Sequence, residues 1–337
     1  MSDAILTVSD LKVHFTVRPR GDGFLAPARK LKAVDGVSFA VAPGETLGIV
    51  GESGCGKSTL GRAILRLIEP TAGKVVWMGE DLAHLSAGKM RKRRRELQII
   101  FQDPLASLNP RMTVGDIIAE PLDSFYPSMP RPERKARVQA MMAKVGLLPQ
   151  MINRYPHEFS GGQAQRIGIA RAMILEPKLI ICDEPVSSLD VSIRAQIVNL
   201  LMQLQRDFGL SLIFISHDLS VVRHISNRVL VLYLGKVMEL AETEELNTHP
   251  RHPYTKALLS AAPVPDPAFE QGKQRILLGD DLPSPLNPPS GCVFRTRCWK
   301  FRELAEADRK ACLTEVPALE ARGAGSGRVV ACHYPEN

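Results

Sequence analysis

One eight-residue stretch, GESGCGKS at residues 51–58, limits the possible folds of this chain more than any other feature. It matches the phosphate-binding pattern G-x-x-x-x-G-K-[ST] in full. The strand-like run TLGIV precedes it and the helical run TLGRAIL follows it, which is the context that the pattern requires. A glycine-rich turn with a chance lysine is the alternative, and the flanking strand and helix disfavour it. The stretch therefore predicts an α/β fold that binds phosphate groups at the start of a helix.

The residue types in this stretch suit a triphosphate together with its metal ion. The glycines allow the backbone to curl so that its N–H groups point at phosphate oxygens. Lys57 is expected to reach the β- and γ-phosphates of ATP, and Ser58 to offer its hydroxyl to Mg²⁺. We interpret Cys55 as a small residue that fits the loop. The predicted ATP-binding residues of the loop are Gly51, Glu52, Ser53, Gly54, Cys55, Gly56, Lys57, Ser58 and Thr59.

A second stretch, KLIICDEP at residues 178–185, is an apolar strand that ends in two carboxylates. Acids at the end of a buried strand are costly to desolvate, which favours a functional role over two solvated side chains. Asp183 is expected to hold Mg²⁺. Glu184 is expected to orient and polarise a water molecule for attack on the γ-phosphate. The two stretches together predict an ATPase.

The segment FSGGQAQRIGIARAM, residues 159–173, closely resembles the signature of ATP-binding-cassette (ABC) ATPases, usually written LSGGQ. An apolar phenylalanine stands in place of the usual leucine. Other motifs of that family stand in the family's order. By this resemblance Gln102 in IIFQDP is the Q-loop glutamine, Asp190 in SSLD belongs to the D-loop, and His217 in FISHD is the switch histidine. A satisfied core histidine is the alternative for His217, and the motif order disfavours it.

The resemblance implies that two subunits share each ATP, which lies between the phosphate loop of one and the signature of the other. A helix that begins with SGGQ offers an anion-binding N-terminus, which agrees with that role. The implied signature residues, acting on the partner's ATP, are Ser160, Gly161, Gly162 and Gln163. The implied catalytic residues are Glu184, His217 and Gln102. The implied Mg²⁺ ligands are Ser58, Gln102 and Asp183, and Asp190 acts across the interface.

Alternating strand-like and helical runs, such as KLIICDE, RAQIVNLLMQLQRDF and SLIFISH, predict a parallel sheet covered on both faces. The resemblance implies a P-loop NTPase of the ABC type with a RecA-like core and an N-terminal antiparallel β subdomain. A helical subdomain is expected at about 105–172. The sequence becomes proline-rich after residue 247. We therefore expect a nucleotide-binding domain at 1–250 and a small, loop-rich extension at 251–337.

The adenine base of ATP is expected to stack on an aromatic ring from the first strand. Phe15 in LKVHF is the first candidate and Phe24 the second, because the insertion RPRGDGFLAPARK blurs the family spacing. A strand residue that faces the core is the alternative for Phe15.

The C-terminal part of the sequence indicates one branch of the ABC family. The runs HPYTKALLSAAP and LPSPLNPPSGCVFRTRC resemble the extension of dipeptide and oligopeptide importer ATPases, of the type that pairs with a second, similar ATPase. This resemblance implies ATP hydrolysis that powers peptide import across the cytoplasmic membrane. The implied partners are the second ATPase, two membrane permease subunits and an external peptide-binding protein, with no nucleic acid. The chain would lie peripherally on the cytoplasmic face of that membrane.

Two alternatives stay open. Close relatives of the peptide importers move nickel or other small solutes, and no residue of this chain is expected to contact the cargo. Soluble cassette ATPases of DNA repair or translation usually carry a coiled-coil insertion or two cassettes, and neither is apparent here. The net charge of +7 suits nucleic acid, nucleotide or an anionic membrane equally. No apolar run approaches the roughly 20 residues that span a bilayer, and the N-terminus has no signal-peptide pattern.

Four of the six cysteines lie near the C-terminus, at Cys292, Cys298, Cys312 and Cys332. Four thiolates can hold Zn²⁺ or an iron–sulfur cluster. The spacing lacks the close C-x₂-C pairs of structural zinc sites. The peptide-importer ATPases that the chain resembles can carry a [4Fe–4S] cluster on this pattern, so we expect that cluster, with Zn²⁺ as the alternative. Four thiols packed as small apolar residues would need no metal.

Overall fold

The residues described by the computed structural model are 4–17, 28–262, 275–279, 282–321 and 327–336. They form two compact units. The phosphate-loop unit comprises the described residues within 4–41, 47–83 and 217–336. The signature unit comprises residues 42–46 and 84–216. The described part of the expected C-terminal extension therefore belongs to the phosphate-loop unit.

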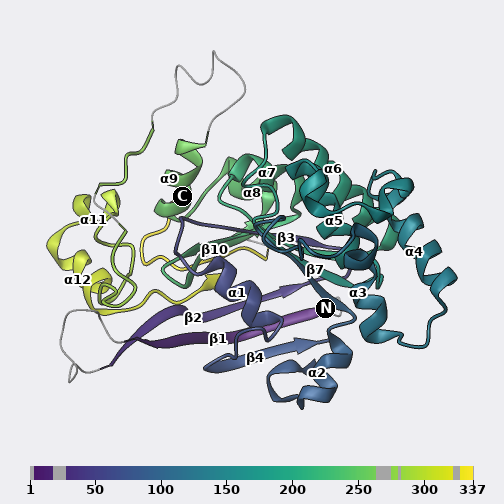
Figure 1. Cartoon of the computed structure of the whole chain (residues 1–337). Coiled ribbons are helices and arrows are strands. Elements are labelled where there is room, and N and C mark those ends of the chain that lie inside the picture. Colours follow the sequence, from purple (N-terminus) through teal and green to yellow (C-terminus); the bar gives the residue numbers. More distant parts are fainter. Residues whose placement is uncertain (1–3, 18–27, 263–274, 280–281, 322–326, 337) are drawn as a thin grey trace. The chain divides into compact units, whose positions relative to one another are not determined.

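A four-stranded antiparallel sheet forms one layer of the phosphate-loop unit (Figure 1). Its strands, in order across the sheet, are β2 (Arg29–Val41), β1 (Leu6–Val17), β4 (Ala72–Trp77) and β5 (Glu80–Asp81). Leu6 on β1 lies opposite Val41 on β2 and opposite Trp77 on β4. All three of these side chains are buried, so they place one face of the sheet on the core. This sheet confirms the expected antiparallel β subdomain.

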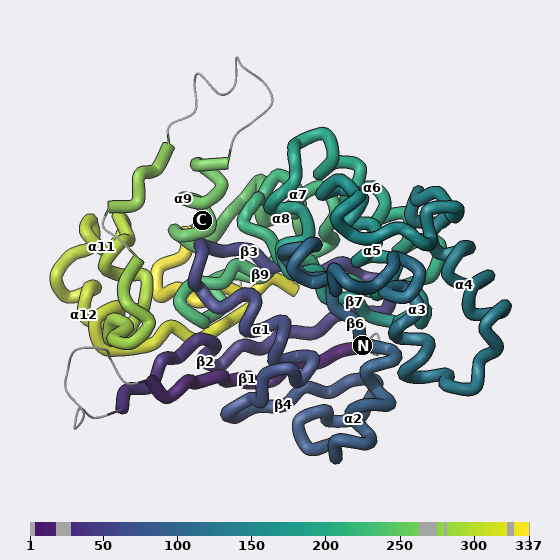
Figure 2. The backbone as a smooth tube through the Cα atoms, viewed as in Figure 1, coloured from purple at the N-terminus to yellow at the C-terminus, as the bar shows by residue number. Residues whose placement is uncertain are grey.

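A second sheet in this unit contains the strand that leads into the phosphate loop. Figure 2 shows that strand, β3 (Thr46–Val50), beside β9 (Arg228–Tyr233), with which it pairs in parallel. β9 pairs antiparallel with β10 (Lys236–Glu242). Two short strands of the extension, β12 (Val329–Val330) and β11 (Glu320–Ala321), continue the sheet beyond β10. Main-chain hydrogen bonds therefore tie the extension to the nucleotide-binding fold.

The helices of this unit are α1 (Lys57–Ile64), α7 (Leu219–Ile225), α8 (Thr243–Thr248), α9 (Pro253–Ala261), α11 (Trp299–Glu303) and α12 (Glu306–Thr314). A 3₁₀ turn, η1 (Leu82–His84), follows β5 directly. Leu60, Ala63 and Ile64 of α1 are buried, and the helix contacts β1 and β2. Their spacing of three and four residues places these side chains on one face of α1, which fixes the helix that follows the phosphate loop.

The signature unit contains three parallel strands, in the order β8 (Ser211–Ile215), β7 (Leu179–Asp183) and β6 (Leu97–Ile100). Every residue of β7 and β8 is buried, as in parallel strands that are covered on both faces. The helices of this unit are α2 (Ala87–Arg93), α3 (Val114–Phe125), α4 (Arg131–Lys144), η2 (Pro149–Asn153), η3 (Pro156–Glu158), α5 (Gly161–Met173) and α6 (Val191–Phe208). The units together confirm the expected α/β class. Within the part of the chain that the structure describes, no helix has the length and apolar character needed to cross a membrane.

Candidate functional site

The phosphate loop is held in a tight curve between β3 and α1. Its φ angles at Gly51, Gly54 and Gly56 are 155°, 78° and 106°. Residues with side chains would be strained in these conformations. A Cβ atom on Gly51 would also collide with the carbonyl oxygen of Leu232, and one on Gly56 with that of Ala33. The two outer glycines therefore let the loop pack directly on the main chain of β9 and β2.

The Lys57 side chain is buried and reaches back over the loop that precedes it. Its Nζ donates to the carbonyl oxygen of Gly51 at 2.8 Å and to that of Glu52 at 3.0 Å. Lys57 is also the first residue of α1, and Gly56 at the N-cap has no side chain to satisfy the first N–H groups of the helix. An ammonium group and a helix N-terminus at one loop are a site for an anion.

Cys55 agrees with its interpretation as a small packing residue. It is buried, and burial raises the pKa of its thiol. Its carbonyl oxygen accepts a hydrogen bond from Gly235 N at 2.8 Å. The uncharged thiol fills space beneath the loop while the main chain of Cys55 fastens the loop to the turn between β9 and β10.

The signature unit brings Gln102 and Glu184 together. Gln102 follows β6, and its Nε2 donates to Glu184 Oε2 at 3.3 Å. Glu184 directly follows β7, and its N–H donates to Ile215 O of β8 at 3.1 Å. The φ angle of Glu184 is 48°, a left-handed conformation that costs energy in a residue other than glycine and is common at functional sites. Asp183, the last residue of β7, is 1% exposed.

The signature segment begins α5 with a reciprocal cap. Ser160 Oγ accepts from Gln163 N at 3.4 Å, and Gln163 Oε1 accepts from Ser160 N at 3.0 Å. A Cβ on Gly162 would lie 2.5 Å from Cγ2 of Ile193 on α6, so glycine is required for this close approach. Ser160 and Gly161 are exposed at the end of the helix. Phe159, which replaces the leucine of the signature pattern, is buried as an apolar residue should be.

The D-loop and switch residues are both exposed. Asp190 is the N-cap of α6, and the next residue, Val191, is 80% exposed. His217 is exposed too, which excludes the alternative that it is a core histidine.

The structure gives Phe15 a surface position on β1. Its ring is 38% exposed, and the residue pairs across the sheet with Leu31 of β2. A core-facing role is therefore wrong for Phe15, and its ring remains available for stacking. Phe24, the second candidate, lies outside the described residues.

Two residues of the extension contact the phosphate loop, and sequence reasoning missed both. The hydroxyl of Tyr254, in the run HPYTKALLSAAP, accepts a hydrogen bond from Glu52 N at 3.1 Å. Arg297, in FRTRC, donates from Nη1 to both carboxylate oxygens of Glu52 at 2.9 Å. The extension therefore reaches the second residue of the ATP-binding motif.

The four C-terminal cysteines line one cavity, and all six cysteines of the chain are free thiols. Cys292 N donates to Cys312 O at 2.9 Å, so a main-chain hydrogen bond joins two of the four cysteines. Burial, and then the neighbouring thiols, raise the pKa of Cys292 to about 11 and that of Cys332 to about 12. No three His, Cys, Asp or Glu side chains of the described residues are placed so as to hold a single metal ion.

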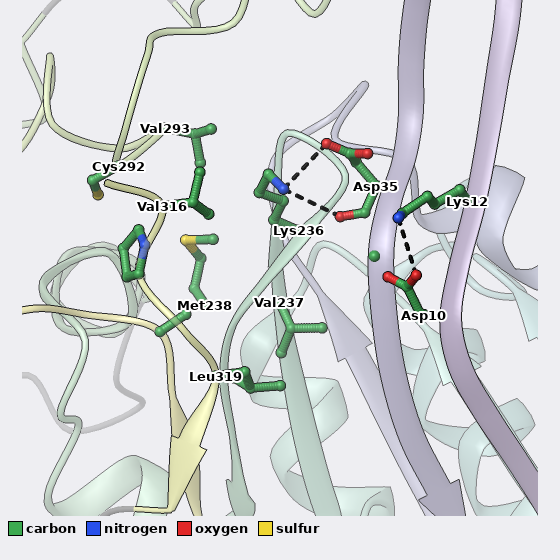
Figure 3. A pocket seen from close by; sticks show the side chains of 13 residues that line it. Asp10, Lys12, Asp35, Lys236, Val237, Met238, Cys292, Val293, Val316 and Leu319 are labelled. Atoms are coloured by element: carbon green, nitrogen blue, oxygen red, sulfur yellow. Dashed lines mark hydrogen bonds and ion pairs between the residues drawn. The ribbon is translucent and has the colours of Figure 1, made fainter. Parts of the chain in front are cut away.

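A cavity of about 360 Å³ lies in the phosphate-loop unit, and Figure 3 shows the side chains that line it. Its apolar wall comes from residues such as Met238 and Val316, and Cys292 stands in the same wall. Its charged residues are paired, Lys12 with Asp10 at 3.0 Å and Lys236 with Asp35 at 3.1 Å. No residue of 51–59 lines this cavity. The nucleotide site is thus identified by loop chemistry and not by cavity size.

Two protein families match parts of the chain. Residues 34–187 match the ABC transporter family, and residues 238–303 match the C-terminal region of oligopeptide and dipeptide transporters. The oligopeptide transport ATP-binding protein OppF of Salmonella typhimurium is 64% identical over 294 residues, which cover 87% of this chain and 88% of that protein. The oligopeptide transport ATP-binding protein AppF of Bacillus subtilis is 52% identical over 332 residues, which cover 98% and 97%.

Solved structures of ABC proteins are similar to part of this chain. CbiO1 from Clostridium perfringens, part of the ABC transporter complex cbiONQ, superposes with a TM-score of 0.62 at 27% identity, covering 73% of this chain and 92% of that chain. The dimeric ATP-binding cassette MJ0796, bound to ADP and Pi in a post-hydrolysis state, gives 0.62 at 28% identity, covering 71% and 98%.

Proposed function

This chain belongs to the ABC family of oligopeptide transport ATP-binding proteins, and we propose from this premise that its ATP hydrolysis powers the import of oligopeptides. The observation that carries the proposal is the combination of a complete phosphate loop with the peptide-transporter region at 238–303. The same described unit contains both. A chain with these two parts is an ATPase dedicated to a peptide transporter.

ATP binding begins at the phosphate loop. The curved main chain of Gly51–Gly56 and the N-terminus of α1 attract the phosphates, and the buried Lys57 ammonium adds a positive charge. Mg²⁺, when bound, neutralises charge on the β- and γ-phosphates. Ser58, Gln102 and Asp183 would hold it, and their hydroxyl, amide and carboxylate oxygens are the hard ligands that Mg²⁺ prefers. Phe15 is proposed as the stacking partner of adenine.

Hydrolysis depends on Glu184, Gln102 and His217. Glu184 accepts a proton from the attacking water, and the hydrogen bond from Gln102 orients its carboxylate. His217, exposed after β8, is proposed to contact the γ-phosphate. Charge that develops on the transferred phosphoryl group is stabilised by the loop N–H groups and by Lys57.

Each ATP is proposed to lie between two ATPase subunits, as the dimeric form of MJ0796 suggests by similarity. The exposed N-terminus of α5, with Ser160, Gly161, Gly162 and Gln163, faces the partner's ATP. Asp190 acts across the same interface. The proposed partners are a second, similar ATPase, two permease subunits and an external peptide-binding protein. The complex places this chain on the cytoplasmic face of the membrane.

The cysteines of the extension are proposed to hold a [4Fe–4S] cluster. The donor set fits because Cys292, Cys298, Cys312 and Cys332 line one cavity and present four thiols. These residues would hold the cluster, which would cross-link the extension and could accept or release an electron. Zn²⁺ on the same thiolates is the alternative, and it would require the thiols to move closer together, because no three of the described side chains are placed to hold a single ion.

A transport assay tests the proposed function. Vesicles that contain the assembled transporter are supplied with ATP inside and labelled cargo outside. Uptake of oligopeptides that stops with Lys57→Ala supports the proposal. Uptake of nickel but not of peptides would instead assign the chain to the nickel-importing branch, and dipeptide uptake alone would narrow the cargo.

A further inference from the structure

The segment GCVFRTRC, residues 291–298, connects two features that the sequence keeps far apart. Its two cysteines, Cys292 and Cys298, line the cavity that all four C-terminal cysteines share. Arg297, one position before the second of these cysteines, contacts Glu52 of the phosphate loop through both carboxylate oxygens at 2.9 Å. Successive turn hydrogen bonds run from Arg295 N to Cys292 O and from Arg297 N to Phe294 O, so the segment is compact.

The extension makes a second contact with Glu52, through the main chain of Glu52. Its N–H donates to the Tyr254 hydroxyl at 3.1 Å, and Tyr254 is fully buried. Phe294 packs against Tyr254 and Tyr233, with ring centroids 5.3 Å apart in each pair. The three packed rings therefore hold the segment that carries Arg297 next to the Tyr254 hydroxyl, which binds the main chain of the phosphate loop.

The Arg297–Glu52 pair is sheltered from solvent. The side chain of Arg297 is 9% exposed and that of Glu52 is 26% exposed, so water and salt screen the attraction less than at an open surface. Burial alone would lower the pKa of Arg297, but the Tyr233 hydroxyl and the Glu52 carboxylate raise it. The guanidinium group therefore stays charged.

Glu52 poses an electrostatic problem for the loop to which it belongs. The loop attracts a triphosphate, whereas a carboxylate on the same loop repels it. The Lys57 ammonium is engaged with the main-chain oxygens of Gly51 and Glu52. Arg297 supplies a positive charge directly on the Glu52 carboxylate.

We propose that Arg297 is a positioning residue for the ATP site: it neutralises Glu52 and holds that side chain against the extension, so that the phosphate loop keeps its affinity for the triphosphate. The peptide-transporter extension is then part of the nucleotide-binding machinery as well as an appendage to it. This inference rests on the proposed ATP binding at residues 51–59.

The test measures the dissociation constant of ATP for the purified full-length chain. Arg297→Gln keeps most of the side-chain volume but removes the charge, and it is expected to weaken ATP binding about tenfold. Adding Glu52→Gln removes the charge that Arg297 neutralised and is expected to restore binding to within about threefold of wild type. Arg309→Gln is the matched control, because Arg309 Nη2 donates to Arg302 O inside the extension at 2.6 Å.

The outcomes separate this inference from the function on which it rests. If Lys57→Ala loses ATP and Arg297→Gln binds it as wild type does, the role of Arg297 is overturned and the ATP site stands. If the double variant remains as weak as Arg297→Gln, the residue is only structural and the inference fails. If the wild-type chain binds no ATP, both fail. In the assembled transporter, Arg297→Gln is expected to raise the KM for ATP and to change kcat little.

Discussion

The side-chain amide of Gln102 donates a hydrogen bond to the carboxylate of Glu184 at 3.3 Å, although the two residues follow different strands. Gln102 comes after β6 and Glu184 after β7, and these neighbouring parallel strands end at the same edge of the sheet. The strained main chain of Glu184, with φ of 48°, fixes one partner of this contact. The pair is the part of the proposed catalytic site that a single described unit contains.

Gln102→Ala is expected to lower the ATPase rate of the assembled transporter by about tenfold or more, because Glu184 loses the group that orients it. ATP binding by the isolated chain, measured without Mg²⁺, should change little, since the phosphate loop is untouched. Rate and binding measurements on the same preparation check this split. Equal losses in both would assign Gln102 to nucleotide binding instead.

Lys57→Ala is expected to weaken ATP binding by roughly 100-fold, since a buried charge-assisted contact to the phosphates is lost. Lys74→Ala removes an exposed lysine of β4 and serves as the matched control. Titration with ATP compares the two variants. Similar affinities for both would mean that the loop lysine does not hold phosphate.

Gly162→Ala is expected to reduce ATP hydrolysis in the assembled transporter while leaving ATP binding by the single chain intact. Its new Cβ would lie 2.5 Å from Ile193 and would displace the N-terminus of α5 or the start of α6. Gly168→Ala lies in the same helix, and a Cβ there meets no atom within 4 Å, so it is the control. Activity that survives Gly162→Ala would argue against a role for this helix end on the partner's ATP.

The cysteine cavity is expected to carry about four irons per chain after anaerobic purification. Cys312→Ser removes one thiol of the cavity and should lower the iron content sharply. Cys182→Ala, a change in β7 that leaves the cavity intact, should not. Elemental analysis with a visible spectrum decides the matter. Zinc in place of iron supports the alternative, and a metal-free, folded protein rejects the site.

The sequence was most informative where chemistry is local. The phosphate loop needs glycines at fixed positions because Cβ atoms would collide with neighbouring main chain, and this requirement is visible as the motif itself. The capping box of Ser160 and Gln163 is likewise a spacing of three residues. The fold class followed because buried parallel strands read as continuous apolar runs.

Long-range contacts were the part that sequence could not predict. Arg297 and Glu52 are 245 positions apart, and Tyr254 and Glu52 are 202 positions apart. No periodicity encodes such pairs, because they depend on how the whole unit packs. The exposure of Phe15 could not be predicted from the sequence either, because the packing of the sheet determines which face of β1 is buried.

The central claim is that this chain couples ATP hydrolysis to peptide import, and Glu184→Gln in the assembled transporter tests it most directly. The variant keeps the side-chain volume of residue 184 and one oxygen that can accept from Gln102, but it removes the carboxylate that accepts the proton of water. We predict that ATP still binds with near wild-type affinity, while ATP hydrolysis and oligopeptide uptake into vesicles both fall by about 100-fold or more. Uptake or hydrolysis at the wild-type rate would contradict the account.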